Sequence, residues 1–249
     1  MTGAAASAGP EHGGDTPAQE VLEVLEVLER GEMTVHGRIA GSSNATLLVT
    51  CTLGSRELLA VYKPVAGERE LWDFPPGLHR REVAARALAE ALGWGFVPET
   101  VLRVDAPFGV GSLQRVVEGR SHYFELRDEG RWDRELRRIA TFDVIANNAD
   151  RKSGHVLVAE GRLWGIDHGL TFHAHPKLRT VIWDYAGEAL DPDDAVDLAR
   201  LVEVGLPDAL AAQLAPQERD ALEERVLELL DQGRLPEPRS ERAFPWPLV

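Results

Sequence analysis

The order of predicted strands and helices constrains the fold of this 249-residue chain more than any other feature. Between residues 33 and 118 the hydrophobic pattern predicts three short strands, a helix over residues 78–94 and two further strands. From residue 119 the pattern becomes mainly helical, interrupted by one hairpin over residues 155–167. Strands and helices that are segregated along the chain predict an α+β fold with a β-rich N-lobe and a mainly helical C-lobe.

Changes in composition predict where these lobes begin and end. Residues 1–15 are rich in Ala, Gly and Ser, so we expect a disordered N-terminal tail. The N-lobe, residues 16–118, begins with a helix that starts at Thr16 and Pro17. The C-lobe spans residues 119–235, and the proline-broken residues 236–249 form a C-terminal tail on the surface.

Composition narrows the class of protein. Hydrophobic residues make up 44% of the chain and charged residues 27%, which is typical of globular proteins, and no apolar run reaches the roughly 18 residues of a membrane span. The net charge of -14 argues against nucleic-acid binding and against stable membrane association. The single Cys51 excludes an internal disulfide and no secretory signal is visible, so we expect a cytoplasmic protein.

Two features of the predicted sheet suit a phosphate-bearing ligand. Residues 41–44, GSSN, join the first two strands and offer small side chains and backbone N–H groups, although an ordinary hairpin loop has the same pattern. Lys63, one of only three lysines, ends the third strand and could act as a compact charge on phosphates or simply be exposed. Glu82, on the apolar face of the next helix, could pair with Lys63, because an unpaired buried carboxylate is costly.

A dense polar packet lies in the C-lobe, where NNADRKSGHVLV is followed by GIDHG. Asp150 follows a helix, His155 opens one strand of the predicted hairpin and Asp167 ends the other, so we expect the three side chains to converge. Two carboxylates and a third donor suit Mg²⁺ with substrate phosphates, and a carboxylate there could serve as a general base. Ordinary turn chemistry explains the same residue types.

The C-lobe histidines raise a second possibility, a zinc site. His155, His168, His173 and His175 are close in sequence. The pattern has no cysteine partner and no recognised zinc spacing, which favours solvated or phosphate-adjacent histidines.

Six segments occur in an order that is more specific than any one of them. In chain order they are GSSNATLLV, AVYKP, REVAARALAEALG, SLQRVVEG, DVIANNADRKSGHVLV and WGIDHGLTF. Together they resemble the kinase core of the phosphatidylinositol 3-/4-kinase superfamily, with the type II phosphatidylinositol 4-kinases and short actinobacterial proteins of this type most similar. The resemblance covers residues 38–185.

This resemblance implies a two-lobed protein-kinase-like fold that binds ATP and Mg²⁺ or Mn²⁺ in the cleft between its lobes. It implies that the phosphates are covered by Ser42, Ser43 and Asn44 and bound by Lys63, which pairs with Glu82. The adenine hinge would be the segment of Gln114, Val116, Val117 and Glu118. The catalytic aspartate would be Asp150, and the metal ligands would be Asp167 and His155. From the residues alone, this strand running into Gly119 could present backbone N–H and C=O groups to a base, or residues 114–118 could be a plain connector between the lobes.

Two departures from the family pattern bear on activity. His155 stands where the family usually has Asn, and an imidazole suits Mn²⁺ better than Mg²⁺. Lys152 stands where the 3-kinases usually have His, and its charge could stabilise the transferring phosphoryl group.

The sequence therefore predicts an ATP-dependent phosphotransferase. No cluster of Lys or Arg follows GIDHG, so we expect a protein or a small soluble alcohol as acceptor rather than a lipid. One alternative is a nucleotide-binding pseudokinase that acts as a regulatory module, motivated by His155. Another is AMP transfer on the same fold.

Overall fold

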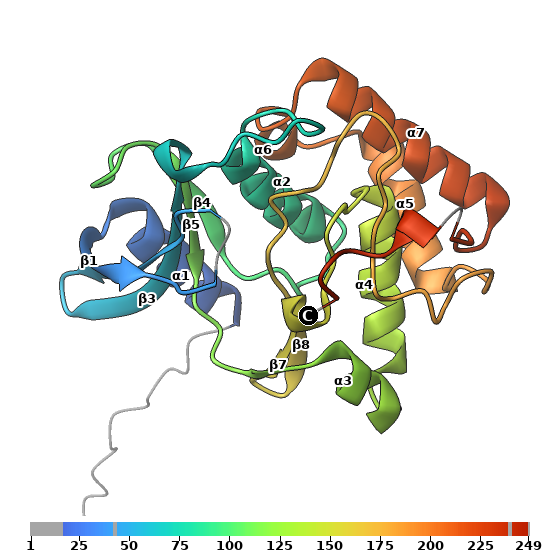
Figure 1. Ribbon diagram of the computed structural model, residues 1–249, viewed down its shortest axis with the longest axis horizontal. Helices are drawn as coiled ribbons and strands as arrows, with labels where there is room; N and C mark the ends of the chain where they lie inside the picture. The colour runs from blue at the N-terminus through green and yellow to red at the C-terminus, as the bar shows by residue number, and fades with distance from the viewer. Residues whose placement is uncertain (1–16, 42–43, 239–240, 249) are drawn as a thin grey trace, which may run out of the picture.

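The computed structural model describes residues 17–41, 44–238 and 241–248 (Figure 1). The predicted tail at residues 1–15 lies outside the described residues, as do two of the residues expected over the phosphates, Ser42 and Ser43.

The N-lobe is a five-stranded antiparallel sheet with strand order β1-β2-β3-β5-β4. Its strands are β1 Glu32–Arg38, β2 Leu47–Leu53, β3 Arg56–Pro64, β4 Thr100–Arg103 and β5 Gly111–Arg115. Side-chain alternation gives the sheet one apolar face, on which Cys51 and Tyr62 are fully buried. Helix α1, Pro17–Arg30, covers this face with Leu28, because its Val and Leu residues recur at helical spacing between glutamates.

Helix α2, Leu78–Ala91, lies between this sheet and the C-lobe (Figure 1). Its fully buried Ala84, Ala85 and Leu88 belong to the larger hydrophobic core, which extends through the C-lobe. Small alanines allow close approach of neighbouring elements, and the helix is buried on most of its circumference. This position brings the polar residues of α2 to the boundary between the lobes.

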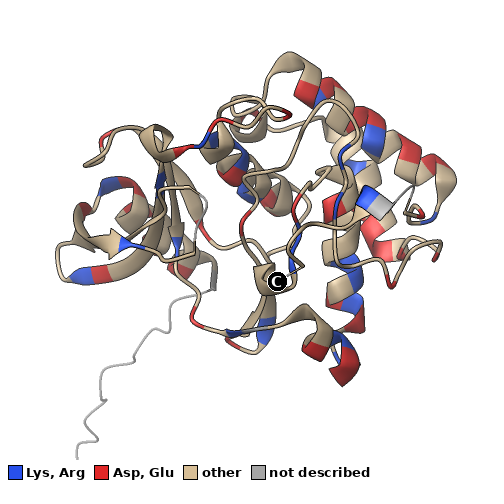
Figure 2. Ribbon diagram, viewed as in Figure 1, with Lys and Arg blue, Asp and Glu red and all other residues tan. Residues whose placement is uncertain are grey.

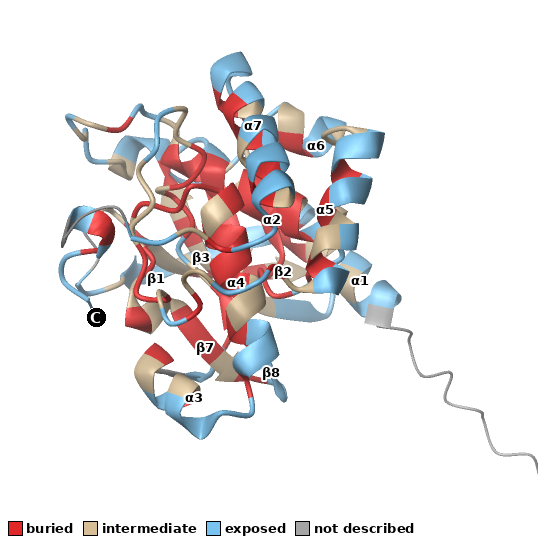
Figure 3. Ribbon diagram, turned by 90° about the vertical axis from the view of Figure 1, so that its right-hand side faces the viewer, coloured by how far each residue is buried: buried red, intermediate tan, exposed pale blue. Residues whose placement is uncertain are grey.

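The C-lobe combines helices with a small three-stranded sheet ordered β6-β7-β8. Its elements are β6 Arg120–Ser121, α3 Tyr123–Glu129, α4 Asp133–Ile145, β7 Val156–Ala159, β8 Arg162–Gly165, α5 Pro192–Val204, α6 Asp208–Ala211 and α7 Pro216–Gln232. Figure 3 shows buried residues concentrated on α2, α4 and the inner sides of α5 and α7. The predicted start of α5 is confirmed, since the Asp191 carboxylate accepts the Asp193 N–H at 2.9 Å.

Residues 166–191 contain no helix or strand, although we expected mainly helix beyond the hairpin. Asp167 and Phe172 have positive φ angles of 58° and 60°, which interrupt regular structure. The segment is fixed instead by hydrogen bonds to its neighbours, such as the one from the Arg179 N–H to the Asn148 carbonyl at 2.8 Å. An extended, irregular segment therefore lies across the polar packet.

The C-terminal tail returns to the same region. The Ser153 N–H donates to the Leu248 carbonyl at 2.9 Å, and the Thr180 N–H donates to the Ala243 carbonyl at 3.0 Å. The tail is thus attached to the polar packet and to the segment after Asp167, while Trp246 stays 88% exposed.

The two-lobed α+β fold class predicted from the sequence is confirmed. The five N-lobe strands, the helix between them and the hairpin β7–β8 lie where the pattern predicted them. The two-residue strand β6 was not predicted, because so short a strand has no alternation to detect. None of the described helices has the length and hydropathy needed to cross a bilayer.

Candidate active site

Lys63 is the centre of a charged cluster that joins the two lobes. It lies near the end of β3, and its side chain is 23% exposed. The ammonium group forms ion pairs with the carboxylates of Glu82 on α2 and of Asp167 beyond β8, the latter at 2.9 Å. Burial opposes its charge, but Asp167 and Glu82 together raise the pKa of Lys63 above its ordinary value. The lysine is therefore a fixed positive charge.

Glu82 uses both carboxylate oxygens to position Lys63. One oxygen binds the ammonium group, and the other accepts the backbone N–H of His168 at 3.0 Å. The side chain is only 1% exposed, so burial raises its pKa while Lys63 opposes that change. A Cβ at Gly169 would lie 3.3 Å from Glu82 Oε1, so any larger residue there would press on the carboxylate oxygen that binds Lys63. The structure thus makes the pairing expected from the sequence.

Asp167 is the most accessible member of the cluster. Its side chain is 50% exposed and its backbone lies in the left-handed region, which aspartate tolerates better than most residues. One oxygen contacts Lys63, and the other lies 3.4 Å from His155 Nε2. The positive charge of Lys63 holds the pKa of Asp167 well below its usual range, although burial opposes this. The group is an anion under all ordinary conditions.

His155 faces Asp167 as a neutral ring. Burial lowers its pKa to about 4, although Asp167 opposes this change. Its Nδ1 accepts the Lys152 backbone N–H at 3.3 Å, which places the ring proton on Nε2, the atom that faces Asp167. Binding of a metal at Nε2 would require this proton to move to Nδ1, so the role of His155 as a metal ligand stays a prediction.

Asp150 lies on the loop after α4 and pairs with Lys152. Lys152 Nζ is 3.2 Å from Asp150 Oδ2. Burial raises the pKa of Asp150 to about 6, Lys152 opposes this, and the charge of Asp167 raises it further. The pKa of Asp150 therefore lies in the range that suits a general base near neutral pH.

Arg151 anchors this loop and was not among the residues selected from the sequence. Its guanidinium is fully buried and binds Asp143 on α4 at 2.9 Å, the Ile166 carbonyl at 3.0 Å and His168 Nε2 at 2.9 Å. One side chain thus connects α4 to the residues on both sides of Asp167. An aspartate inside the apolar run TFDVIA could have indicated it, since a buried carboxylate requires a partner.

The two asparagines of the polar packet are structural. The Asn148 amide donates to Asp143 at 2.9 Å, while its oxygen accepts the Asp150 N–H at 3.0 Å. The Asn147 amide donates to the carbonyls of His173 and His175, each at 2.8 Å. The packet therefore positions both Asp150 and the segment that follows Asp167.

The other residues predicted to bind the nucleotide make their described contacts within the protein. Asn44 Oδ1 accepts the Arg69 N–H at 2.9 Å, so its side chain fixes the loop. The Gln114 amide donates to Thr100 at 2.8 Å, and the Val116 N–H donates to the Leu59 carbonyl at 2.9 Å, so neither donor is directed at a base. Val117 is buried and Glu118 is exposed. Among the described residues, none of these five forms a hydrogen bond with the cluster around Lys63 that the structure records.

The cluster is not a complete metal site by itself. Within the described ranges, no group of three or more His, Cys, Asp or Glu side chains is arranged to hold a metal ion. Mg²⁺ often takes only one or two protein carboxylates together with substrate phosphates. The accessible Asp167 carboxylate fits that pattern.

One curated protein is clearly similar to this chain in sequence. The chain is 41% identical over 261 residues to Protein Rv2133c of Mycobacterium tuberculosis (strain ATCC 25618 / H37Rv), covering 89% of this chain and 94% of that protein. No family model matches the chain. The coverage is large enough to include both lobes.

Solved structures share the fold at low sequence identity. The Golgi casein kinase with Mn/ADP bound superposes with a TM-score of 0.59 and 15% identity, covering 87% of this chain and 76% of that chain. The structure of hydra Fam20 with sugar gives a TM-score of 0.51 and 15% identity, covering 87% and 88%. These likenesses establish a kinase-like fold, and they do not distinguish the phosphatidylinositol 3-/4-kinases from other kinases of this fold.

Proposed function

This chain belongs to the same family as Protein Rv2133c of Mycobacterium tuberculosis, and we propose that it is an ATP-dependent phosphotransferase. The observation that supports this most strongly is the position of Lys63, held between Glu82 and Asp167 where the two lobes meet. Kinases use a strand lysine that is positioned by a helix glutamate to bind nucleotide phosphates, and an aspartate to bind the metal.

In this proposal each charged residue has one task. Lys63 binds the phosphates of ATP, and Glu82 keeps the ammonium group in place. Asp167, with an accessible carboxylate, holds Mg²⁺ or Mn²⁺, and the metal supplies positive charge to the transferring phosphoryl group. The Mn/ADP complex of the Golgi casein kinase supports a divalent metal and a nucleotide as the ligands of such a cleft.

Asp150 is the proposed base that accepts the proton of the acceptor hydroxyl. A base acts in its ionised form, and with a pKa of about 6 Asp150 is largely ionised at pH 7. Lys152, 3.2 Å from Asp150, favours the ionised form and adds positive charge near the reaction.

Replacing Lys152 with Met should move the acidic limb of the pH dependence of kcat/KM to higher pH. Loss of the cation raises the pKa of Asp150, so the base becomes ionised only at higher pH. We expect the limb to shift by about one pH unit. Lys177→Met is the matched control, because Lys177 pairs with Asp73. An unchanged limb in Lys152→Met, with turnover retained, would rule out Asp150 as the titrating base.

The remaining expected contacts stay part of the proposal. We assign residues 41–44, including Ser42, Ser43 and Asn44, to the loop over the phosphates, and residues 114–118, with Gln114, Val116, Val117 and Glu118, to the adenine hinge. Since the side chain of Gln114 and the N–H of Val116 are already engaged, a base would bind backbone groups beyond Val116. The proposed lobes are residues 16–118 and 119–235.

We also propose that the protein is of the phosphatidylinositol 3-/4-kinase-like type but phosphorylates a protein or a small soluble alcohol. Figure 2 shows basic and acidic residues intermixed along the helices. A net charge of -14 opposes binding to anionic lipid.

The proposal is tested with purified protein, ATP labelled at the α or γ position, and Mg²⁺ or Mn²⁺. Phosphotransfer predicts that only the γ label reaches an acceptor, the protein itself or water. Label from the α position on the acceptor would instead indicate AMP transfer. Absence of any transfer or hydrolysis with both metals contradicts the proposal.

A pseudokinase is the second candidate, and the neutral His155 facing Asp167 favours it. A metal on Nε2 would require the ring proton to move to Nδ1, and the Lys152 N–H would then lose its acceptor. This candidate predicts that ATP raises the melting temperature without any turnover.

Replacing His155 with Asn should increase turnover with Mg²⁺ relative to Mn²⁺ by roughly tenfold. An amide oxygen is a harder ligand than imidazole and needs no tautomer change, so it completes a Mg²⁺ site beside Asp167. The measurement is kcat with each metal for both proteins. Activity that appears only in the variant supports the pseudokinase, while an unchanged metal ratio shows that His155 does not contact the metal.

A further inference from the structure

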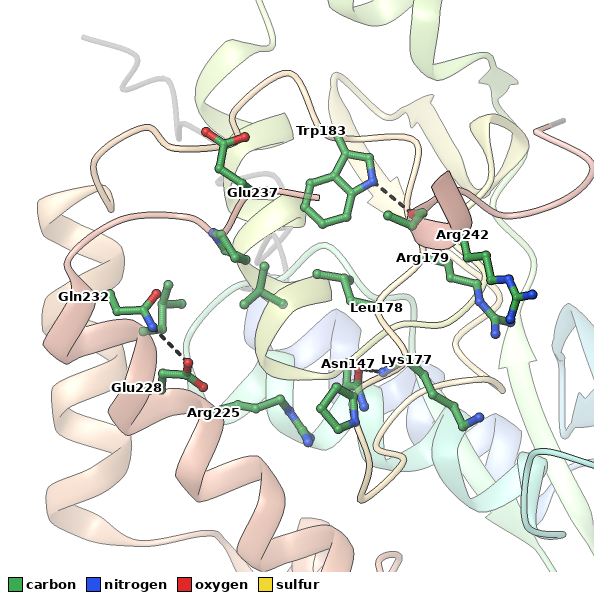
Figure 4. A pocket seen from close by; sticks show the side chains of 15 residues that line it. Asn147, Lys177, Leu178, Arg179, Trp183, Arg225, Glu228, Gln232, Glu237 and Arg242 are labelled. Carbon is green, nitrogen blue, oxygen red and sulfur yellow. Dashed lines mark hydrogen bonds between the residues drawn. The ribbon is translucent and has the colours of Figure 1, made fainter. Parts of the chain in front are cut away.

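The C-terminal tail is attached firmly at Ala243. The carbonyl of this buried residue accepts two N–H groups, the backbone N–H of Thr180 and the indole N–H of Trp183, each at 3.0 Å (Figure 4). Both donors belong to the irregular segment that follows Asp167. This end of the tail is therefore fixed to that segment.

The other end of the described tail contacts the loop that carries the proposed base. The Leu248 carbonyl accepts the Ser153 N–H at 2.9 Å. Ser153 follows Lys152, whose ammonium group pairs with Asp150. The tail therefore runs from the segment after Asp167 to a point three residues beyond Asp150.

The catalytic loop, this segment and the tail lie side by side in that order. The Arg151 N–H donates to the Arg179 carbonyl at 3.0 Å, and the Val181 N–H donates to the Arg151 carbonyl at 3.1 Å. Thr180, between them, donates instead to the Ala243 carbonyl of the tail. The tail thus pairs with the same short stretch that holds the catalytic loop.

Between its two anchors the tail is weakly held. Pro245 and Pro247 have no N–H to donate, and among the described residues no recorded hydrogen bond involves residues 245–247. Trp246 is 88% exposed and Leu248 37%, while Pro245 is buried. The far end depends on one backbone hydrogen bond and one buried proline, and a single hydrogen bond adds little net stability.

A cavity separates the base of the tail from helix α7. Its volume is about 340 Å³, and its lining includes Leu178, Trp183 and residues of α7 together with Pro236, Glu237 and Ala243 (Figure 4). The tail is therefore not packed closely against α7 here. Because contacts across such a space are few, movement of the tail loses little packing with that helix.

A polypeptide acceptor would need the space that the tail occupies. Its hydroxyl must come within about 3 Å of the Asp150 carboxylate, and a serine or threonine side chain is short, so its backbone must pass close to the loop. The Ser153 N–H is a backbone donor on this loop and is directed at the tail. An extended acceptor would use this donor, as peptides do when they bind through backbone hydrogen bonds.

The sequence of residues 244–248, FPWPL, suits a segment that docks in an extended form. Prolines restrict the detached chain, so that docking costs little conformational entropy. Docking that is inexpensive in entropy and weak in contacts gives a segment that a second extended chain can displace.

We propose that residues 244–248, here called the strap, occupy the place of an extended polypeptide acceptor beside the catalytic loop and are displaced when such an acceptor binds. The inference rests on the proposed phosphotransferase activity and deepens it, because it commits the acceptor to a polypeptide. In the reaction the acceptor hydroxyl oxygen bonds to the γ-phosphorus of ATP, its proton passes to Asp150, and the bond to ADP breaks. Water and small alcohols reach the site without displacing the strap.

Replacing the buried Pro245 with Glu in the full chain should release the strap, because a charged side chain there favours solvent. The acceptor is a degenerate peptide library with a central serine. Its KM should fall about tenfold at unchanged kcat, since the docked strap reduces the fraction of protein that can bind an acceptor. ATP hydrolysis in water should not change. A stop codon in place of Pro245, which removes residues 245–249, should have the same effects.

Pro238→Glu is the matched control, because Pro238 is an exposed proline of the same tail outside the strap, and its KM should match the wild type. A blocked peptide of residues 243–248, AFPWPL, should inhibit the shortened protein in competition with the library and not with ATP. Circular dichroism checks folding. If the shortened protein does not fold, Pro245→Glu in the full chain decides.

Two results would overturn the strap. One is an unchanged KM for the library in Pro245→Glu and in the shortened protein. The other is phosphoryl transfer to glycerol while the library stays unphosphorylated. In both cases the γ label still reaches water or glycerol, so the phosphotransferase proposal stands. If no variant transfers the γ label to any acceptor or to water, the phosphotransferase proposal itself fails, and the strap with it.

Discussion

Replacing Asp167 with Asn should lower ATP turnover by a factor of at least about 10²–10³ while leaving the protein folded. Asp167 provides the accessible carboxylate of the cluster and compensates the charge of Lys63. The amide keeps the size of the side chain but removes the charge that a metal and Lys63 require. Steady-state hydrolysis of γ-labelled ATP measures the effect, and the melting temperature checks folding.

Asp193→Asn is the control for this change. Asp193 is an exposed aspartate on α5 that pairs with Arg134 and is not a member of the cluster around Lys63. We expect its turnover to match the wild type. If Asp167→Asn and Asp193→Asn turn over ATP equally, the site that hydrolyses ATP is not the one around Lys63.

Replacing Arg151 with Met should destabilise the protein by about 3–5 kcal/mol, because it leaves the fully buried Asp143 carboxylate without its cation. The same change removes the contacts to the Ile166 carbonyl and His168 that fix the residues around Asp167. Urea unfolding followed by circular dichroism measures the free energy of unfolding, and turnover should also decrease.

Arg134→Met is the appropriate comparison for stability. Arg134 also pairs with an aspartate, but both side chains are exposed, so we expect a change of no more than about 1 kcal/mol. A loss of less than about 1 kcal/mol in Arg151→Met would contradict the anchoring role that the structure gives this residue.

The sequence predicts the elements of this fold well where periodicity is strong. The alternation in β2 and β3 and the helical spacing in α2 and α7 correspond to observed strands and helices. The irregular segment 166–191 was not predicted, because its conformation depends on side chains of distant residues such as Asn147. Hydrophobic periodicity contains no information about such contacts.

The candidate site was only partly predictable. A lysine at a strand end and a glutamate on an apolar helix face predicted the Lys63–Glu82 pair, since each otherwise lacks a partner. The role of Arg151 was missed. Asp143 inside the apolar run indicates that a buried carboxylate needs a partner, but which cation is buried against it depends on the assembled fold. The tautomer of His155 likewise depends on the Lys152 N–H, a contact set by backbone geometry.

The most direct test of the central claim is a crystal structure of the protein with Mn²⁺ and a non-hydrolysable ATP analogue. The account predicts that Lys63 Nζ contacts the nucleotide phosphates, that Glu82 still pairs with Lys63, and that the metal binds Asp167. A nucleotide bound elsewhere, or one in the cleft whose phosphates contact neither Lys63 nor a metal on Asp167, would contradict it.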